Sequence, residues 1–134
     1  MLGDMLGSSK GKVTGRRVIT GPDGNPQVET SFEAAGKLLK VDFTEMGTYT
    51  SVMRPDGTLY GDGQGILMGK QGQSMSWKGS GVGVLKRDGS VSYRGAVYYQ
   101  TTTPKWRRLN RVAAVFEYEV DRNGNTSATL WEWK

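Results

Sequence analysis

Short turn sequences recur at regular intervals and divide the chain into runs of strand length. Each places a glycine beside Asp, Asn or Gln between more apolar stretches. They are Pro22-Asp23-Gly24-Asn25, Pro55-Asp56-Gly57, Gln71-Gly72, Arg87-Asp88-Gly89 and Arg122-Asn123-Gly124. Asp-Gly and Asn-Gly tolerate the positive φ angles that two-residue hairpins require. No segment longer than one turn shows the 3.6-residue period of a helix. The spacing therefore predicts a series of antiparallel hairpins.

The stretch from Asp56 to Gln100 has glycine at alternate positions inside two of these runs. The alternating glycines are Gly61, Gly63 and Gly65 in the first run and Gly79, Gly81 and Gly83 in the second. Glycine weakens a strand interior, so such a ladder indicates a sharply bent sheet or the close approach of another group. The letters GDGQG and GSGVG resemble phosphate loops, but neither matches the dinucleotide fingerprint or opens a helix after a strand. The ladder favours the bent wall of a small closed barrel.

The remaining runs predict about eight strands. Lys10 to Thr20 alternates weakly and fits an edge or closing strand. Gln27 to Ala35 alternates cleanly and is ended by Gly36. Leu38 to Met53 is long, with a bulge or bend expected at Met46-Gly47. A last hairpin pairs Val112 to Val120 with Thr126 to Trp133. We predict an all-β fold: one antiparallel barrel domain over residues 1–134, of the allene oxide cyclase-like or lipocalin-like kind.

One connection has helical character. In Thr101 to Asn110, Pro104 follows a threonine that could cap a helix, which predicts one short helical turn near residues 104–109. The same segment carries the densest positive charge, at Lys105, Arg107, Arg108 and Arg111, around Trp106. A tryptophan among basic residues could stack on a nucleobase. An amphipathic cap over the barrel end is the favoured interpretation, and a nucleic-acid partner is not expected.

Composition excludes several classes of chemistry. The 134 residues include no Cys and no His. Disulfides, thiolate metal sites and Ser-His or Cys-His catalysis are therefore excluded, and we expect neither a metal nor a cofactor. The net charge of +5 is modest and fits a solvated surface. The start MLGDMLGSSKGK is too short and polar for a signal peptide, and no apolar run approaches membrane-spanning length. We expect a cytoplasmic protein with no membrane association.

The turn rhythm and glycine ladders resemble those of the allene oxide cyclase-like barrels, and in particular of small uncharacterised bacterial proteins on that barrel. The likeness is carried by Gly61–Gly65, Trp77–Gly83, Ser92-Tyr93-Arg94-Gly95 and the closing Leu130–Lys134. It covers most of the chain after about Thr30 and includes no catalytic motif. The resemblance implies a barrel that forms an oligomer, and it assigns no site residue and no activity.

Two carboxylates interrupt otherwise apolar strand faces. Glu45 continues the face of Val41 and Phe43, and Glu132 continues the face of Leu130. A carboxylate in the lumen would have a raised pKa and could bind or deprotonate a ligand, whereas one at a strand end would simply meet water. The aromatic residues are core candidates that could also line a ligand pocket. The complete set of candidate ligand-binding residues is Glu45, Tyr49, Trp77, Tyr93, Tyr99, Phe116, Tyr118 and Glu132.

Three functions remain open from the sequence. The first is binding of a small hydrophobic ligand in the lumen. The second is a cofactor-free cyclase or isomerase that shapes a reactive hydrophobic substrate. The third is a non-catalytic homo-oligomeric module, favoured by apolar residues on faces that should be polar, namely Val82, Val84, Tyr98, Trp131 and Trp133. A filled core would exclude the first two, and a cavity on the order of several hundred Å³ with a buried carboxylate would support them.

Overall fold

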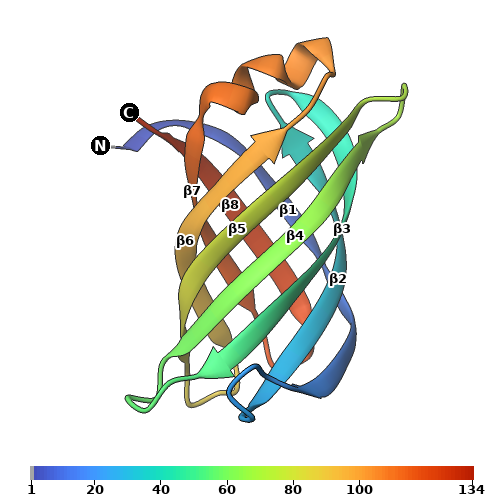
Figure 1. The fold of residues 1–134 in the computed structure, drawn as a ribbon. Helices are drawn as coiled ribbons and strands as arrows, with labels where there is room; N and C mark the ends of the chain where they lie inside the picture. The colour runs from blue at the N-terminus through green and yellow to red at the C-terminus, as the bar shows by residue number, and fades with distance from the viewer. Residues whose placement is uncertain (1) are drawn as a thin grey trace.

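Eight antiparallel strands pair in sequence order and close into a barrel, with one 3₁₀ helix across an end (Figure 1). The computed structural model describes residues 2–134. The elements are β1 Leu2–Thr20, β2 Pro26–Leu38, β3 Val41–Met53, β4 Leu59–Gly69, β5 Ser74–Leu85, β6 Val91–Gln100, η1 Pro104–Arg111, β7 Ala113–Val120 and β8 Asn125–Trp133. Pairing of β1 with β8 closes the barrel. The predicted all-β, eight-stranded antiparallel barrel is confirmed.

The glycine turns lie where the sequence predicts them, but their geometry differs. Gly24, Gly57, Gly72, Gly89 and Gly124 all have φ between 82° and 88°. The residue before each glycine has a negative φ. The non-glycine residues with positive φ within 2–134 are Leu39 and Lys40, outside these turns. In one turn the amide of Gly57 donates to the carbonyl of Arg54 at 2.9 Å. The hairpins predicted at these positions are therefore confirmed, although their turns lack the two successive positive φ angles of a type I′ turn.

The two-residue turn with positive φ angles occurs at Leu39-Lys40 instead. Their φ angles are 49° and 68°, and the flanking residues Leu38 and Val41 are paired. We predicted that Gly36 ends the preceding strand, whereas β2 runs on to Leu38. Neither Leu nor Lys favours positive φ, so the sequence contains no local signal for this turn. Burial of Leu38 and a 2.9 Å hydrogen bond from the Leu39 amide to the Leu6 carbonyl hold it in place.

Strand registers place the bulges in β1 rather than in β3. Pairing of β3 with both neighbours passes through Met46-Gly47 without a shift, so the bulge expected there is absent. The register between β1 and β2 shifts between Val13 and Gly15, and further shifts against β8 occur near Met5. β1 is the closing strand, as its weak alternation indicated, and it begins earlier than predicted, at Leu2.

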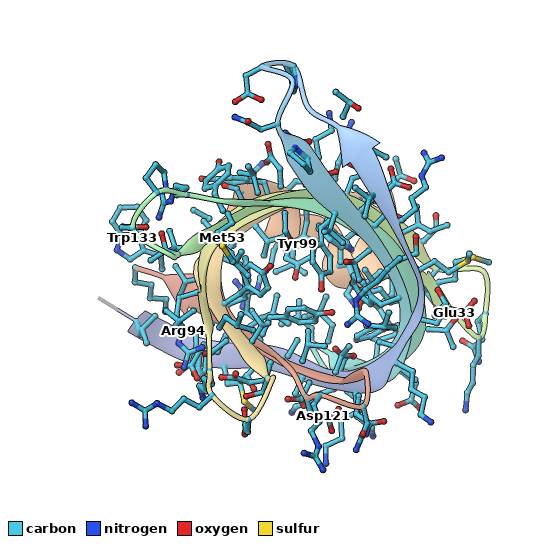
Figure 2. The ribbon with its side chains drawn as sticks, turned by 90° about the horizontal axis from the view of Figure 1, so that it is seen from below. Glu33, Met53, Arg94, Tyr99, Asp121 and Trp133 are labelled. Carbon is cyan, nitrogen blue, oxygen red and sulfur yellow. The ribbon has the colours of Figure 1, made fainter. Side chains whose placement is uncertain are left out.

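Side chains alternate between the lumen and the outer surface along every strand. Both glycine ladders face the lumen, together with Phe43, Glu45 and Tyr49 of β3. Figure 2 shows Tyr99 inside the ring of strands, with Glu33, Arg94 and Trp133 projecting outward. On that outer surface Arg94 Nη1 lies 3.2 Å from Glu119 and Nη2 lies 3.7 Å from Glu117, as cross-strand ion pairs.

The helix η1 covers one end of the barrel and is anchored by tryptophan (Figure 1). Trp106 is fully buried, and its indole N–H donates to the Leu38 carbonyl at 2.9 Å. The helical turn predicted near residues 104–109 is confirmed and continues to Arg111. Thr103 precedes the helix, but its hydroxyl contacts the Ser74 backbone instead of capping. Trp106 is therefore part of the core under the cap and is not exposed for stacking on a base.

Candidate functional site

A cavity of about 110 Å³ lies inside the barrel, with a mostly apolar lining. All strands contribute to it. Seven of the eight residues proposed from the sequence line it: Glu45, Tyr49, Trp77, Tyr93, Tyr99, Phe116 and Tyr118. Glu132 is not among the residues that line it. The structure therefore brings together most of the predicted set.

The cavity is smaller than the several hundred Å³ set above as support for binding or catalysis, because aromatic rings lie over the glycine ladder. A methyl group added at Gly83 would lie 2.6 Å from Tyr93 Cε1, and one at Gly81 would lie 3.1 Å from Phe116 Cζ. At Gly65 it would collide with the Trp77 indole. Real Cβ contacts are rarely this short, so the rings occupy the space that a side chain at each of these glycine positions would need. The inner-face glycines mainly make room for rings and leave only a small open volume.

The rings around the cavity form one contacting cluster. Ring centroids are 5.6 Å apart for Phe32 and Tyr118, 5.8 Å for Tyr49 and Tyr118, and 5.8 Å for Tyr49 and Tyr93. Trp77 joins the cluster through Phe32, at 6.4 Å. These separations lie in the range that aromatic pairs favour. Sequence reasoning missed Phe32 as a site residue, although the alternation of the Gln27–Ala35 run puts it on the more apolar face of that strand.

Glu45 is the polar centre of the cavity. Burial raises the pKa of its carboxyl from 4.5 to about 7, and the nearby indole of Trp77 opposes this by favouring the charged form. The two groups do not reach standard hydrogen-bond geometry, since Trp77 Nε1 has no partner within residues 2–134. No Lys or Arg in that range forms an ion pair with Glu45 either. Its carboxyl is therefore half ionised near neutral pH and lacks a protein counter-ion.

The tyrosine hydroxyls around the cavity stay neutral at physiological pH. Burial raises the pKa values of Tyr49, Tyr93, Tyr99 and Tyr118 above the ordinary value of 10.0. Tyr93 is hydrogen bonded to Ser51, with Oη and Oγ 2.8 Å apart. Tyr118 Oη is buried and has no hydrogen-bond partner in the described chain. A buried polar group without a partner is costly, so this corner of the lumen has unused hydrogen-bonding capacity.

Glu132 lies at the helix-covered end of the barrel. Its carboxylate accepts a hydrogen bond from Arg108 Nη1 of η1 at 3.1 Å, and its side chain is 17% exposed. The pair joins β8 to the helix. Its predicted contact with a ligand is not tested by this arrangement, but the ion pair shows that its charge has a protein partner, unlike that of Glu45.

The arrangement combines an apolar enclosure with one group able to exchange a proton near pH 7. It can hold a small molecule and hydrogen bond to it, or donate or accept a proton. Within residues 2–134 there is no group of three or more Asp, Glu, His or Cys side chains that could hold a metal ion. The same residues include no helix of the length and apolarity needed to cross a membrane.

Comparison with solved structures finds the same barrel in proteins of very different sequence. A protein of unknown function from Clostridium acetobutylicum has a TM-score of 0.83 at 12% identity, covering 98% of this chain and 99% of that chain. A β-barrel-like protein from Acinetobacter baumannii has a TM-score of 0.83 at 12% identity, covering 100% and 96%. An enzyme from Penicillium herquei has a TM-score of 0.67 at 17% identity, covering 96% and 92%.

These similarities establish the fold alone, at identities this low. The sequence matches no family model and no curated protein. The chain is thus a small β-barrel of unknown function, similar in architecture to uncharacterised bacterial barrels and to a fungal enzyme.

Proposed function

We propose that this barrel binds a small, mainly apolar molecule in its lumen, with Glu45 orienting the ligand. The observation that carries the proposal is a lone carboxyl inside an aromatic-lined cavity, without a protein counter-ion. Burying such a group costs free energy that packing does not recover. Buried ionisable groups with strongly shifted pKa values in a cavity are typical of functional sites.

The volume of the cavity limits the size of the ligand. About 110 Å³ is well below the roughly 300–1,000 Å³ of sites for drug-sized molecules. An engineered apolar cavity of about 150 Å³ in another protein binds benzene. The proposed ligand is therefore compact, no more than about the size of a single six-membered ring.

Binding is tested by native mass spectrometry of the protein purified from its natural source. We expect a bound small molecule that an Ala128→Leu variant loses, because Ala128 lines the cavity and the larger side chain would fill it. The matched control is Ala35→Leu, since Ala35 faces outward on β2. Equal retention by both variants would place the molecule outside the lumen. Failure of the wild-type protein to bind any ring-sized compound in solution would reject the proposal.

A second candidate is a cofactor-free isomerase or cyclase, as the resemblance to the allene oxide cyclase-like barrels suggests. A carboxyl with a pKa of about 7 is suited to accept and return a proton near neutral pH. The Penicillium herquei protein on a similar barrel is described as an enzyme, which supports this candidate by analogy of fold only. Proton exchange between solvent deuterium and a bound ligand, lost in Glu45→Gln, would favour catalysis over binding alone.

Exposed apolar side chains support a homo-oligomer as a separate proposal. Tyr98 is 57% exposed and Trp133 is 64% exposed on the outer surface, and Val84 is also exposed. Where such groups form a contiguous patch, they are typical of association surfaces. The native mass spectrum that tests ligand binding would also report the number of chains, and a monomer at micromolar concentration would contradict this proposal.

A further inference from the structure

The chemistry of the lumen also indicates the charge of its ligand. We infer that the ligand is a small organic amine bound as its ammonium ion, held between the Glu45 carboxylate and the surrounding aromatic rings. This inference rests on the proposed function, because it requires a ligand in the lumen. It adds that the ligand is a cation, which distinguishes it from the neutral apolar molecules that the same cavity could hold.

The first argument is the missing positive charge. Of the charged residues along the cavity, Glu45 faces inward on β3, whereas Asp62 borders it on β4 with an exposed side chain. Among the described lining residues none is Lys or Arg. A carboxylate removed from water is costly unless it is paired, and without a partner the group is partly protonated instead. An ammonium group in the cavity would supply the positive charge that pairs with the Glu45 carboxylate.

The second argument is the ring cluster. Trp77 lies close enough to affect the ionisation of Glu45, and Phe32, Tyr49 and Tyr118 continue the aromatic wall from it. Aromatic faces attract cations through their quadrupoles, and sites for substituted ammonium ions are commonly aromatic cages. The same rings provide apolar contact for the carbon part of the molecule. A carboxylate beside aromatic rings is thus complementary to an amine on a compact hydrocarbon body.

The third argument is the balance of donors and acceptors. An ionised carboxylate only accepts hydrogen bonds, and it can take several. The Trp77 indole, which favours the ionised form of Glu45, falls short of a hydrogen bond to it. The Tyr118 hydroxyl also lies near Glu45, and within residues 2–134 it too has no hydrogen-bond partner. The Tyr93 hydroxyl is already engaged with Ser51. Glu45 therefore has unused hydrogen-bond acceptor sites. An ammonium group can donate up to three N–H hydrogen bonds to them.

Binding should follow the ionisation of Glu45. The titratable groups near it are Tyr99 of β6 and Tyr118 of β7, with Tyr49 farther along β3, and all three remain neutral up to pH 8. With a pKa of about 7, the carboxyl is roughly one-tenth ionised at pH 6 and nine-tenths ionised at pH 8. Affinity for an ammonium ion should therefore rise about tenfold over that range. A neutral ligand that accepts a proton from Glu45 would show the opposite trend.

The test uses three probes of matched shape: benzylamine, benzyl alcohol and toluene. Their dissociation constants for the full chain are measured by calorimetric titration at pH 6, 7 and 8. We expect benzylamine to bind at least tenfold more tightly than toluene at pH 8, and to weaken about tenfold at pH 6. Glu45→Gln should abolish this preference, so that benzylamine binds no more tightly than toluene to the variant. The matched control is Glu33→Gln, because Glu33 is exposed on the outer surface of β2.

The outcomes separate the two levels of the proposal. If toluene or benzyl alcohol binds and benzylamine binds no better at pH 8, the ligand is not a cation, and lumen binding stands without this inference. Tighter binding of benzylamine at pH 6 than at pH 8 would also overturn it. If none of the three binds, both the inference and the proposed lumen function fail. The wild-type pH profile decides the question even if Glu45→Gln does not fold.

Discussion

Tyr93 of β6 is hydrogen bonded to Ser51 of β3, with the two hydroxyl oxygens 2.8 Å apart, although β4 and β5 lie between those strands. The Tyr93 ring passes over Gly83 of β5 and Gly61 of β4 on its way. Methyl groups added at those positions would lie 2.6 Å and 3.2 Å from Cε1 of the ring. Because the ladder glycines carry no side chain on the lumen face, a side chain from one strand can reach across two others.

A methyl group at Gly83 should displace this ring. We expect Gly83→Ala to lower the free energy of unfolding by about 1–3 kcal/mol, the usual cost of overpacking a well-packed site. Urea denaturation measures the change. The control is Gly15→Ala, where a methyl group would meet nothing within 4 Å and φ lies outside the positive range, so the expected change is within about 0.5 kcal/mol. Equal effects of the two substitutions would contradict the conclusion that Gly83 makes room for the Tyr93 ring.

The hydroxyl pair itself can be isolated by a double-mutant cycle. Ser51→Ala and Tyr93→Phe each remove one partner, and we expect each to cost about 1 kcal/mol of unfolding free energy. The double variant should cost less than the sum of the two, by a coupling of roughly 0.5–1.5 kcal/mol. Additive effects in urea denaturation would mean that the hydrogen bond contributes nothing to stability.

The architecture was predictable because its signals are local. Turn glycines such as Gly57 and Gly89 mark hairpins by composition alone, and alternation placed Glu45 on the same strand face as Val41 and Phe43. The Leu39-Lys40 turn was not predictable, because packing imposes positive φ on residues that do not favour it. The size of the cavity could not be predicted from the sequence either. It depends on rings such as Trp77 reaching over Gly65 of the neighbouring strand, and strand pairing decides which residues meet there.

The Leu39-Lys40 turn should be improved by glycine. Lys40 has a φ of 68°, a conformation that costs a residue with a side chain about 1 kcal/mol. We expect Lys40→Gly to raise the free energy of unfolding by roughly 0.5–1 kcal/mol in urea denaturation. Lys10→Gly is the control on extended backbone in β1 and should lower it by a similar amount. A loss of stability in Lys40→Gly would show that the lysine side chain contributes more than its backbone strain costs.

The raised pKa of Glu45 makes stability depend on pH. The folded chain holds this proton up to about pH 7, whereas the unfolded chain releases it near 4.5, so the folded state binds more protons between these values. The contribution of Glu45 to stability is therefore greatest below pH 4.5 and is lost as pH rises through 7, by an amount on the order of 3 kcal/mol. We expect Glu45→Gln to remove this dependence. Its stability relative to wild type should rise between pH 4.5 and 8 in parallel urea titrations, and a constant difference would mean that the Glu45 pKa is ordinary.

The final prediction separates Glu132 from Glu45. The Glu132 carboxylate pairs with Arg108 of η1 at 3.1 Å, and Arg108 is half exposed, so the pair should contribute no more than about 1 kcal/mol to stability. We expect Glu132→Gln to lower the unfolding temperature slightly and to leave benzylamine affinity unchanged, whereas Glu45→Gln should lower that affinity at pH 8. Arg108→Gln is the matched control, because it breaks the same pair from the other side and should give the same small thermal shift. If Glu132→Gln weakens ligand binding and Arg108→Gln does not, Glu132 contacts the ligand directly, as the sequence suggested, and the site extends from the cavity toward the helix-covered end.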